Sequence, residues 1–508
     1  MPTLKIQRAL ISVFYKDNLE PIIHELGKSG VEFISTGGTQ EFIEKLGYTV
    51  TPVEKLTGYP SIFGGRVKTL HPNIFGGILY RRHDAGDVKQ SEAYEINAID
   101  LVIVDLYPFE ETVAKGGSEE EIIEKIDIGG ISLIRAAAKN FKAVLIVSSR
   151  KQYQELLKLL TSANCSSKLD DRKHFAAFAF DVTSHYDSAI FSYFNTAATI
   201  PSFKKSIQQG RTLRYGENPH QQGKYYGDLD GLFEQLNGKE LSYNNLVDVD
   251  AAVTLLKEFD GETAFVIIKH TNACGVAIAS ATKDAYLKAY QADTTSAFGG
   301  VLASNKEIDP AAAEEINKLF FEILIAPRYD PKALALLKSK KNRMLLLQKK
   351  GLAEKKQFKS LLNGVIEQDL DLKTDSRDDL KVVTKRAPTE NETDALLFAS
   401  KICKHTKSNT IILAVNGQLL ASGVGQTSRV DALRQAIEKA GTFGFNLKGS
   451  VMASDAFFPF PDCVEIAHKH GIEVVIQPGG SVKDQESISY CNEHNMAMVF
   501  TGIRHFKH

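Results

Sequence analysis

Residues 9–46, A-L-I-S-V-F-Y-K-D-N-L-E-P-I-I-H-E-L-G-K-S-G-V-E-F-I-S-T-G-G-T-Q-E-F-I-E-K-L, decide the fold of the N-terminal region. The first apolar run predicts a strand, and Asp17, followed three residues later by Glu20, predicts the N-cap of a helix. The helix carries one apolar stripe, made of Leu19, Ile22, Ile23 and Leu26. Residues 31–35 predict the next strand, and the turn 36–39 leads into a second helix. This alternation predicts a parallel sheet covered by helices.

The same alternation continues toward residue 150. The short apolar runs 101–104 and 144–147 are typical of strands buried on both faces of a parallel sheet, and a helix is predicted between them over 132–140. We therefore predict an α/β fold with a doubly wound parallel sheet for this region.

A domain boundary is predicted where the sequence becomes polar and irregular, around 196–211. It divides the chain into domains 1–200 and 201–508. A charged stretch, 338–379, predicts a peripheral solvated segment between two halves of the second domain. No repeat of fixed period is visible in the sequence.

The composition of the 508 residues is that of an ordinary globular protein, with 43% hydrophobic and 24% charged residues. It excludes a disordered chain, a fibrous repeat and a disulfide scaffold. The 61 basic and 62 acidic residues give a formal net charge of -1, so no global field attracts nucleic acid or an anionic membrane. Five widely spaced cysteines form no C-x-x-C pair, and no apolar stretch approaches the ~18 residues of a membrane-spanning helix. We therefore expect a cytoplasmic protein.

Two glycine-containing segments of the first domain are candidates for holding an anion. The turn 36–39 (T-G-G-T) lies between a predicted strand and a helix N-terminus, where backbone N–H groups and the helix dipole favour a phosphate. A plain turn explains the same residues equally well. The second segment, 64–72 (G-G-R-V-K-T-L-H-P), places two cations, a hydroxyl and an imidazole beside glycines in an otherwise apolar stretch. Solvated surface charge is the alternative there.

Further candidate groups follow predicted strands. Tyr107 comes just after the strand 101–104, and ligands of open α/β sheets collect at the carboxyl ends of strands. The apolar run 264–268 stops at Lys269 and His270, which we expect to enter a loop together. A tuned imidazole beside a cation suits general-base catalysis with oxyanion stabilisation, although a Lys-His pair is otherwise a common surface coincidence.

Ten motifs, taken in chain order, resemble one family. They are I-S-V-F-Y-K, G-G-R-V-K-T-L-H-P, L-Y-P-F, I-D-I-G-G, R-A-A-A-K-N, L-R-Y-G-E-N-P-H-Q, K-H-T-N-A-C-G, T-S-A-F-G-G, S-D-A-F-F-P-F and the tail T-G-I-R-H-F-K-H. The chain resembles the bifunctional purine-biosynthesis enzymes that carry AICAR transformylase and IMP cyclohydrolase activities. The match runs nearly from end to end.

The resemblance implies formyl transfer from the co-substrate 10-formyltetrahydrofolate to the 5-amino group of AICAR, giving FAICAR, and then dehydrative ring closure of FAICAR to IMP. It implies a methylglyoxal-synthase-like cyclohydrolase domain in 1–200 and a transformylase of two cytidine-deaminase-like α/β halves in 201–508. Zinc deaminases carry a P-C-x-x-C signature, which this chain lacks, so no catalytic metal is expected. The resemblance also implies a homodimer whose transformylase sites draw residues from both chains.

The resemblance assigns roles residue by residue. His270 would take a proton from the attacking amine, and Lys269 would stabilise the oxyanion or protonate the leaving nitrogen. The other residues assigned to AICAR are Arg214, Tyr215, Gly299, Glu322, Asn409, Phe457 and Arg504, and those assigned to the folate are Arg429, Ser481 and Val482. The residues assigned to cyclohydrolase catalysis are Lys68, Tyr107, Asp127 and Lys139. The residues assigned to its nucleotide are Phe14, Tyr15, Lys16, Thr36, Gly37, Gly38, Thr39, Arg66 and Thr69.

Three positions depart from the family pattern. Ala273 replaces a proline after the Lys-His pair, Glu322 replaces an aspartate, and Asp105 replaces an asparagine. The extra negative charge of Asp105 argues against a place beside a phosphorylated ligand.

Two other functions are alternatives: a phosphometabolite-sensing regulatory protein with a degenerate transformylase domain, and a zinc-dependent deaminase. A sensor does not need the two sets of candidate catalytic residues that the chain carries. The missing zinc-ligand spacing opposes the deaminase.

Overall fold

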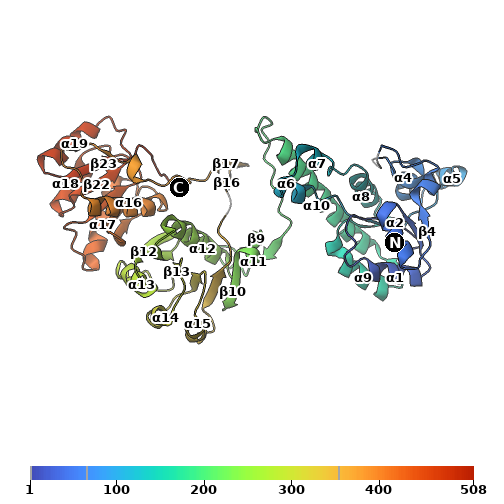
Figure 1. Ribbon diagram of the computed structural model, residues 1–508, viewed down its shortest axis with the longest axis horizontal. Coiled ribbons are helices and arrows are strands. Elements are labelled where there is room, and N and C mark those ends of the chain that lie inside the picture. The colour runs from blue at the N-terminus through green and yellow to red at the C-terminus, as the bar shows by residue number, and fades with distance from the viewer. Residues whose placement is uncertain (1–2, 64–66, 353–354) are drawn as a thin grey trace. The chain divides into compact units, whose positions relative to one another are not determined.

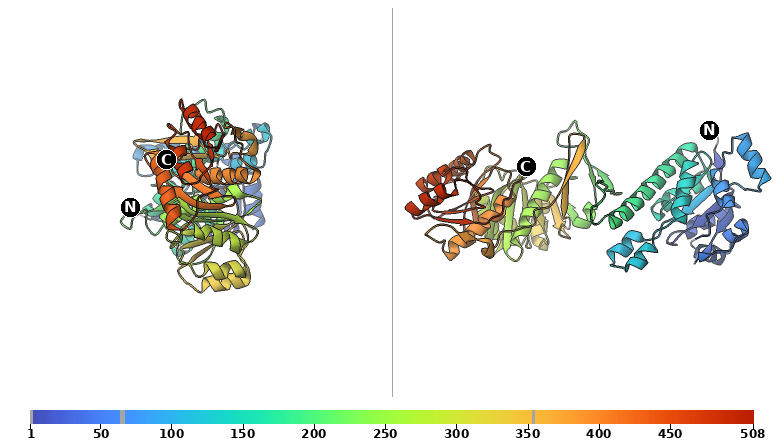
Figure 2. Two further views of the ribbon diagram at one scale, coloured as in Figure 1. Left: turned by 90° about the vertical axis from the view of Figure 1, so that its left-hand side faces the viewer. Right: turned by 90° about the horizontal axis from the view of Figure 1, so that it is seen from above.

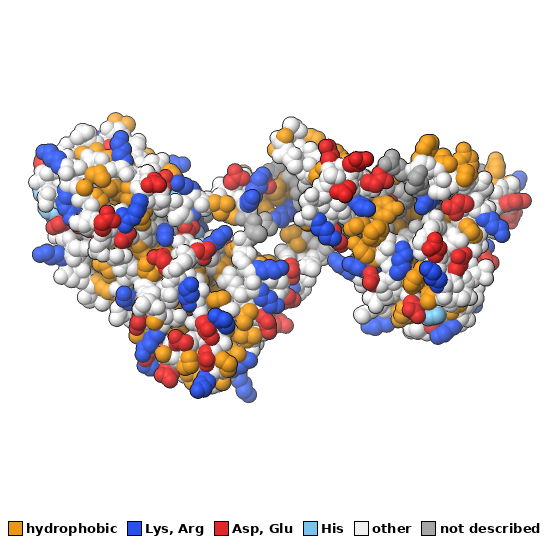
Figure 3. All heavy atoms as spheres, viewed as in Figure 1, with side chains coloured by type: hydrophobic (Ala, Val, Ile, Leu, Met, Phe, Trp, Pro, Cys, Tyr) orange, Lys and Arg blue, Asp and Glu red, His pale blue; other side chains and the backbone are white. Residues whose placement is uncertain are grey.

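The computed structural model describes residues 3–63, 67–352 and 355–508. The chain divides into two compact units, Met1–Gln208 and Gln209–His508. Lysine and arginine side chains are interspersed with acidic ones on the face shown in Figure 3, as expected for a net charge of -1. Among the described residues, no helix is both long enough and apolar enough to cross a membrane.

The sheet of the first unit consists of five parallel strands: β2 (Arg8–Ser12), β3 (Glu32–Ser35), β4 (Val50–Pro52), β5 (Leu101–Val104) and β6 (Leu145–Val147). Their order across the sheet is β4-β3-β2-β5-β6. The chain builds outward from β2 on one side and then returns to build outward on the other, so the order reverses between β2 and β5. Such a switch point is where doubly wound sheets bind ligands, at the carboxyl ends of the strands. The predicted doubly wound fold is confirmed.

Figures 1 and 2 show the helices of the first unit. They are α1 (Glu20–Lys28), α2 (Gly37–Lys45), α3 (Val53–Thr57), α4 (Pro72–Leu79), α5 (Ala85–Ala93), α6 (Phe109–Ala114), α7 (Glu119–Ile123), α8 (Gly129–Lys139), α9 (Tyr153–Ser162) and α10 (Leu169–Phe194). Of these, α2, α3, α8 and α10 contact strands of the sheet, whereas α6 packs on α7 and α10. A short antiparallel pair, β1 (Leu4–Lys5) and β7 (Ser166–Ser167), lies outside the main sheet. The long helix α10 packs on α8 and β6.

The first helix begins later than the sequence predicted. Its N-cap is Leu19, not Asp17, and Pro21 lies in its first turn. Proline is tolerated there because the N–H that it lacks would have no partner in the first turn, whereas further in it breaks the helix. Pro21 therefore fixes the start of α1, and the Asp17 carboxylate instead lies 3.3 Å from the guanidinium of Arg150. The predicted apolar stripe of α1 is buried.

The second unit is built on one twelve-stranded sheet, ordered β10-β15-β14-β13-β11-β12-β20-β19-β21-β22-β23-β18. The strands of its first half are β10 (Phe233–Asn237), β11 (Thr263–Lys269), β12 (Asn272–Ala279), β13 (Val301–Ser304), β14 (Ile323–Ala326) and β15 (Met344–Gln348). Those of its second half are β18 (Lys381–Val382), β19 (Ile411–Val415), β20 (Gln418–Gly423), β21 (Val451–Ser454), β22 (Val474–Gln477) and β23 (Ala497–Phe500). The halves join where β12 pairs with β20.

The two halves repeat one topology. Each has an antiparallel hairpin (β11-β12 or β19-β20), a strand antiparallel to the first hairpin strand (β13 or β21), and two further parallel strands. The helices also correspond: α12 (Tyr243–Leu256) with α16 (Glu390–Lys404), α13 (Thr282–Gln291) with α17 (Arg429–Thr442), α14 (Pro310–Ile316) with α18 (Asp462–Lys469), and α15 (Pro331–Lys338) with α19 (Asp484–Glu493). The expected pair of α/β halves is confirmed.

The segment 338–379 is only partly peripheral. Its apolar run forms β15, which lies inside the sheet between β10 and β14, so the prediction of a wholly solvated segment is wrong. Four apolar side chains in a row outweigh the flanking lysines, because a strand needs only a short buried run. The hairpin of β16 (Lys356–Leu361) and β17 (Gly364–Asp369) is exposed, as predicted. The small elements β8 (Gly210–Thr212), β9 (Lys224–Tyr226) and α11 (Leu229–Leu232) precede the large sheet.

Candidate active sites

A pocket of about 810 Å³ opens in the first unit at the carboxyl ends of β2, β3 and β5, on the switch point of the sheet. The predicted site residues that line it are Phe14, Lys16, Thr36, Gly37, Gly38, Thr39, Lys68, Thr69, Tyr107 and Asp127. Tyr15 lies beside the pocket, with its ring 4.9 Å from that of Phe14. Arg66, also assigned to the nucleotide, lies outside the described residues.

The N-terminus of α2 forms a positive corner of this pocket. Thr36 is the N-cap, and Gly37 has a φ of +53°, a conformation that suits glycine. The N–H groups of the first helical turn have no partner within the helix and attract anions. A Cβ added to Gly37 would lie 3.8 Å from Nζ of Lys68, so the ammonium faces the same backbone. N–H groups and ammonium together suit a phosphate.

The Thr39 hydroxyl connects this corner to β2. It donates to the Val13 carbonyl oxygen at 2.9 Å and accepts from the Val13 N–H at 3.1 Å. Because its single proton is committed to the backbone, Thr39 fixes the position of α2 and reaches a ligand through its main chain.

Asp105 also acts on the loop after β2. Its carboxylate accepts the N–H groups of Phe14 and, at 3.0 Å, of Tyr15. Burial raises the pKa of Asp105, and the two N–H donors oppose that rise. Contrary to the expectation from its charge, Asp105 lines the pocket. The two backbone donors stabilise its carboxylate, which orients the residues that follow β2.

Asp127 and Tyr107 are two titratable residues that line the pocket. Asp127 Oδ1 accepts the N–H of Gly130 at 2.5 Å, and its own N–H donates to the Tyr186 hydroxyl at 2.9 Å. Burial raises the pKa of Asp127. Burial and then the nearby charge of Asp127 raise the pKa of Tyr107, so Tyr107 remains a phenol that can donate a proton. A carboxyl group with a raised pKa in a pocket is suited to proton transfer.

Lys139 is the predicted cyclohydrolase residue that does not line the pocket. It is the last residue of α8, whose first residue, Gly129, does line it. At 1.5 Å per residue, the two ends of this helix are about 15 Å apart. Lys139 is exposed at the end of α8 remote from the pocket, and its catalytic role stays a prediction.

A second cavity of the first unit, of about 550 Å³, lies between α6 and α10. Its lining includes Phe109, His185 and Lys204 but none of the predicted site residues. The 810 Å³ pocket is therefore the candidate cyclohydrolase site.

In the second unit, the Lys-His pair lies at the tip of the β11-β12 hairpin. Lys269 pairs with Asn272, and His270 and Thr271 form a two-residue turn with φ values of +51° and +64°. Lys269 thus stays in the strand, contrary to expectation, because the hairpin pairing continues to its last residue. Turns of this kind favour Asn and Gly.

The equivalent hairpin of the second half shows the contrast. Its two turn residues are Asn416 and Gly417, which match that preference. His270 and Thr271 have bulkier side chains in a conformation that L-residues avoid, and backbone strain of this kind is concentrated at functional sites. The Asp248 carboxylate supports the turn by accepting the Thr271 N–H at 2.7 Å.

Two backbone carbonyl groups hold the Lys269 ammonium. Nζ donates to the Phe298 and Gly299 oxygens at 2.9 Å and 3.0 Å. An added Cβ on Gly299, whose φ is +68°, would lie 3.1 Å from Nζ, so only glycine suits this approach. An ammonium has three N–H donors, and the hydrogen bonds of Lys269 to the described residues use two of them.

Other predicted AICAR residues lie in the same half. Glu322 accepts the side-chain N–H of Asn245 at 2.9 Å, and its backbone N–H donates to the Gly300 oxygen at 3.0 Å. Arg214 lies with its guanidinium carbon 4.7 Å from the centre of the Tyr215 ring. This arrangement presents a cation and a flat ring together, which suits a phosphorylated heterocycle.

The remaining predicted residues belong to the second half. Arg429, at the start of α17, lies 3.3 Å from the Asp455 carboxylate. The ring of Phe506 lies 5.8 Å from the Arg429 guanidinium and 4.3 Å from that of Arg504. Four more predicted residues are on loops of this half. Asn409 donates to the Gln426 oxygen at 3.0 Å, Phe457 follows β21, and Ser481 precedes the fully exposed Val482. Hydrogen bonds among the described residues do not connect these loops with the Lys269 hairpin.

No metal-binding group is present among residues 3–63, 67–352 and 355–508: none of their His, Cys, Asp and Glu side chains form a cluster of three or more suited to a metal ion. The five cysteines are buried and unpaired.

Comparison with known proteins decides the family. The model of the AICARFT/IMPCHase bienzyme matches residues 137–439, and that of the MGS-like domain matches 18–132. The bifunctional purine biosynthesis protein PurH of Bacteroides thetaiotaomicron is 61% identical over 504 residues, which cover 99% of both chains. The chain belongs to the AICARFT/IMPCHase bienzyme family. The PurH proteins of Aquifex aeolicus and Chlorobium chlorochromatii are 46% identical over 510 residues and 47% identical over 519, with at least 99% of each chain covered.

Sequence reasoning missed several residues that shape the sites of this bienzyme-family chain. Asp248 supports the turn and Asn245 contacts Glu322, yet both lie inside α12, where no motif marks them as site residues. Gly130 borders Asp127 so closely that an added Cβ would lie 2.6 Å from a carboxylate oxygen. The pair of glycines after Asp127 was the one available signal for that contact.

Proposed function

We propose that this chain carries out both reactions of its family: formyl transfer from 10-formyltetrahydrofolate to AICAR, and ring closure of FAICAR to IMP. The observation that carries the proposal is the match of this chain, over 99% of its length, to relatives named as bifunctional, together with one candidate site in each of its two units. One centre is the switch-point pocket of the first unit, and the other includes the Lys269–His270 hairpin of the second.

Ring closure is assigned to the pocket of the first unit. The phosphate of FAICAR would bind at the N-terminus of α2 and Lys68. The carboxamide nitrogen then attacks the formamide carbon, and water leaves. Asp127 and Tyr107 are placed to move the protons that this step requires, since a carboxyl group with a raised pKa and a neutral phenol serve as base and acid.

Formyl transfer is assigned to the hairpin of the second unit. The 5-amino group of AICAR attacks the formyl carbon of the folate, and His270 accepts the proton that the amine loses. Two of the three N–H donors of the Lys269 ammonium bind backbone carbonyl groups. The third N–H would donate to the formyl oxygen and stabilise the negative charge that develops there. The carbon–nitrogen bond to the folate then breaks, and the leaving nitrogen takes a proton.

The second half supplies the proposed folate residues Arg429, Ser481 and Val482, together with the three AICAR residues Asn409, Phe457 and Arg504. From the family membership, we propose a homodimer in which each transformylase site combines residues of both chains. We further propose that the enzyme uses no catalytic metal, interacts with neither nucleic acid nor membrane, and works in the cytoplasm, where cysteines stay reduced.

A two-substrate assay tests the proposal. Purified protein given AICAR and 10-formyltetrahydrofolate should form tetrahydrofolate and IMP, each followed by absorbance. Given FAICAR alone, it should still form IMP. Formation of neither product would favour the phosphometabolite-sensing alternative, in which the pocket binds a ligand but performs no reaction.

A further inference from the structure

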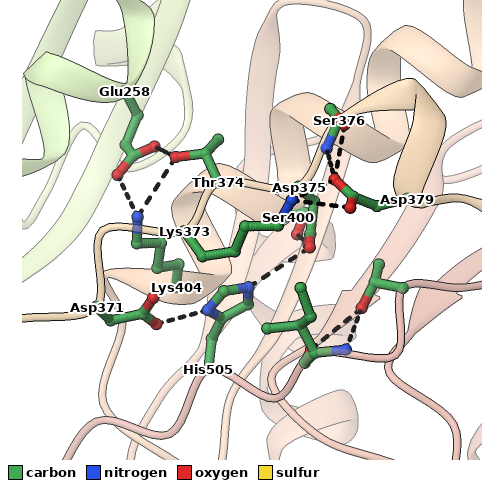
Figure 4. Close-up of polar contacts among 12 residues, drawn as sticks. Glu258, Asp371, Lys373, Thr374, Asp375, Ser376, Asp379, Ser400, Lys404 and His505 are labelled. Carbon is green, nitrogen blue, oxygen red and sulfur yellow. Dashed lines mark hydrogen bonds and ion pairs between the residues drawn. The ribbon is translucent and has the colours of Figure 1, made fainter.

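Residues 371–379, here named the latch, connect β17 to β18 and are attached to both halves of the second unit (Figure 4). On one side, Thr374 donates its hydroxyl proton to Glu258 of the short helix η3 (Lys257–Phe259), in the first half. On the other, Asp375 accepts the hydroxyl proton of Ser400, on α16 of the second half. The latch therefore has a fixed position relative to the residues around it.

His505 attaches the C-terminal tail to this latch. Its Nδ1 lies 2.6 Å from Asp371 Oδ2 and its Nε2 lies 3.6 Å from Asp375 Oδ1, so the imidazole stands between two carboxylates (Figure 4). The imidazole is only 5% exposed. Asp375 Oδ1 is buried and has no hydrogen-bond partner within the described part of the chain. The imidazole is the group nearest to satisfying it.

The protonation state of His505 decides whether both carboxylates are satisfied. Only the imidazolium has an N–H on each nitrogen, whereas a neutral ring turns a lone pair toward one of the two acids. Burial opposes the charge, but Asp375 and Asp371 outweigh it and raise the pKa of His505. The other charged groups nearby belong to the tail (Arg504, Lys507), the latch (Lys373 paired with Asp379), α16 (Lys404 paired with Glu258) and the loop after β21 (Asp455 paired with Arg429).

The tail held in this way is part of the transformylase site proposed above. The His505 N–H donates to the Asp455 carbonyl oxygen at 3.1 Å, and the Asp455 carboxylate contacts Arg429. His505 is flanked in the sequence by Arg504, an assigned AICAR residue, and by Phe506, whose ring lies within 6 Å of both the Arg429 and the Arg504 guanidinium groups. Any movement of His505 thus moves Arg504.

We propose that His505 is a positioning residue for AICAR: clamped between Asp371 and Asp375, it orients the tail so that Arg504 presents its guanidinium to the phosphate of the substrate. The proposal rests on the function proposed above. Loss of the His505 proton frees one carboxylate contact, so AICAR affinity falls as the pH rises through the titration of His505. Asp371 and Asp375 set the pH at which this happens.

The test measures the Kd of AICAR for the full-length protein by isothermal titration calorimetry between pH 6 and pH 9. For His505→Gln we expect about ten-fold weaker binding at the acidic end, the size of a weakened charge-assisted contact, and a Kd that converges with that of wild type at the alkaline end. Asp371→Asn should retain tight binding at low pH but shift the wild-type transition to lower pH by about one pH unit. Lys373→Gln, on the same segment but paired with Asp379, is the matched control and should follow wild type.

A double variant distinguishes a positioning role of His505 from a general structural defect caused by its substitution. His505→Gln should add nothing to the loss already caused by Arg504→Ala, because the first residue acts through the second. Equal Kd values for wild type and His505→Gln at every pH, an unmoved transition in Asp371→Asn, or full additivity in the double variant would each overturn the proposal. A formyl-transfer assay on the wild type runs beside these titrations. Absence of turnover with His505-dependent AICAR binding would refute the proposed function but leave this inference standing.

Discussion

Replacing Gly130 with alanine should disable ring closure while sparing formyl transfer. The added Cβ would lie 2.6 Å and 2.9 Å from the two carboxylate oxygens of Asp127, whereas ordinary contact begins at 3.4 Å. The carboxyl group must therefore withdraw by about 0.8 Å from the position that the Gly130 N–H now gives it. A misplacement of about 1 Å in a catalytic group costs on the order of 100-fold in rate, equivalent to about 2.7 kcal/mol of activation free energy.

The assay follows conversion of FAICAR to IMP in wild type, Gly130→Ala and Gly129→Ala. Gly129 is the matched control because it lies in the same helical turn and its added Cβ would meet only the Thr69 hydroxyl, at 3.2 Å. Both variants gain helix propensity of up to about 1 kcal/mol, so their thermal stabilities should be similar. Ring closure at the wild-type rate in a folded Gly130→Ala protein would refute the role given to Asp127.

Three more predictions concern stability, pH and metal content. Tyr186→Phe should lower the free energy of unfolding, measured by urea titration, by about 1–3 kcal/mol, because the Asp127 N–H and the Lys125 carbonyl both lose the Tyr186 hydroxyl as a hydrogen-bond partner. An unchanged free energy of unfolding would show that these two hydrogen bonds do not stabilise the protein. Although burial opposes it, hydrogen bonds from His405, Lys404 and Thr374 lower the pKa of Glu258 to about 2. The pKa of Glu258 is lower in the folded than in the unfolded protein, so its ionised carboxylate stabilises the folded protein fully above about pH 4.3, and this contribution is lost as the pH falls toward 2. Wild type should therefore lose more free energy of unfolding than Glu258→Gln between pH 5 and pH 3. Equal losses would exclude a charged Glu258 in the folded protein. Metal analysis should find no stoichiometric zinc in active protein, and a ratio near one zinc per chain would revive the deaminase alternative.

Much of the first unit was predictable because short apolar runs and apolar helical stripes indicate which residues are buried. Strand β5 has the predicted bounds, and the turn at Thr36 leads into a helix as expected. The N-cap of α1 was misplaced because the Asp17–Glu20 spacing resembles a capping box, while the restriction that Pro21 places on the backbone proved stronger. Local propensities compete, and sequence spacing alone does not decide which one prevails.

The repeat in the second unit was invisible for a different reason. Its halves share strand order and hairpin geometry but not a spacing of residues, so no period appears in the sequence. The hairpin at His270 was likewise unexpected, because His-Thr is a poor turn pair and argues for a loop. Pairing of β11 with its neighbouring strands and the hydrogen bond from the Thr271 N–H to Asp248 hold that conformation.

The candidate sites were predictable as segments and less so as contacts. Motifs after strand ends located the pocket residues near Gly37 and Tyr107, since topology brings strand ends together. Contacts between segments distant in the sequence were not predictable, such as Asp105 with the backbone after β2 or Asp371 with His505. Such contacts depend on how the elements pack, and a local motif does not specify which distant residue it will contact.

The most direct test of two independent reaction centres is a comparison of His270→Ala with Asp127→Ala, each supplied first with AICAR and 10-formyltetrahydrofolate and then with FAICAR. We predict that His270→Ala forms IMP from FAICAR at the wild-type rate but releases tetrahydrofolate about 10²–10⁴ times more slowly than wild type. Asp127→Ala should release tetrahydrofolate at the wild-type rate and accumulate FAICAR. Loss of both activities in either folded variant would contradict the assignment of one reaction to each unit.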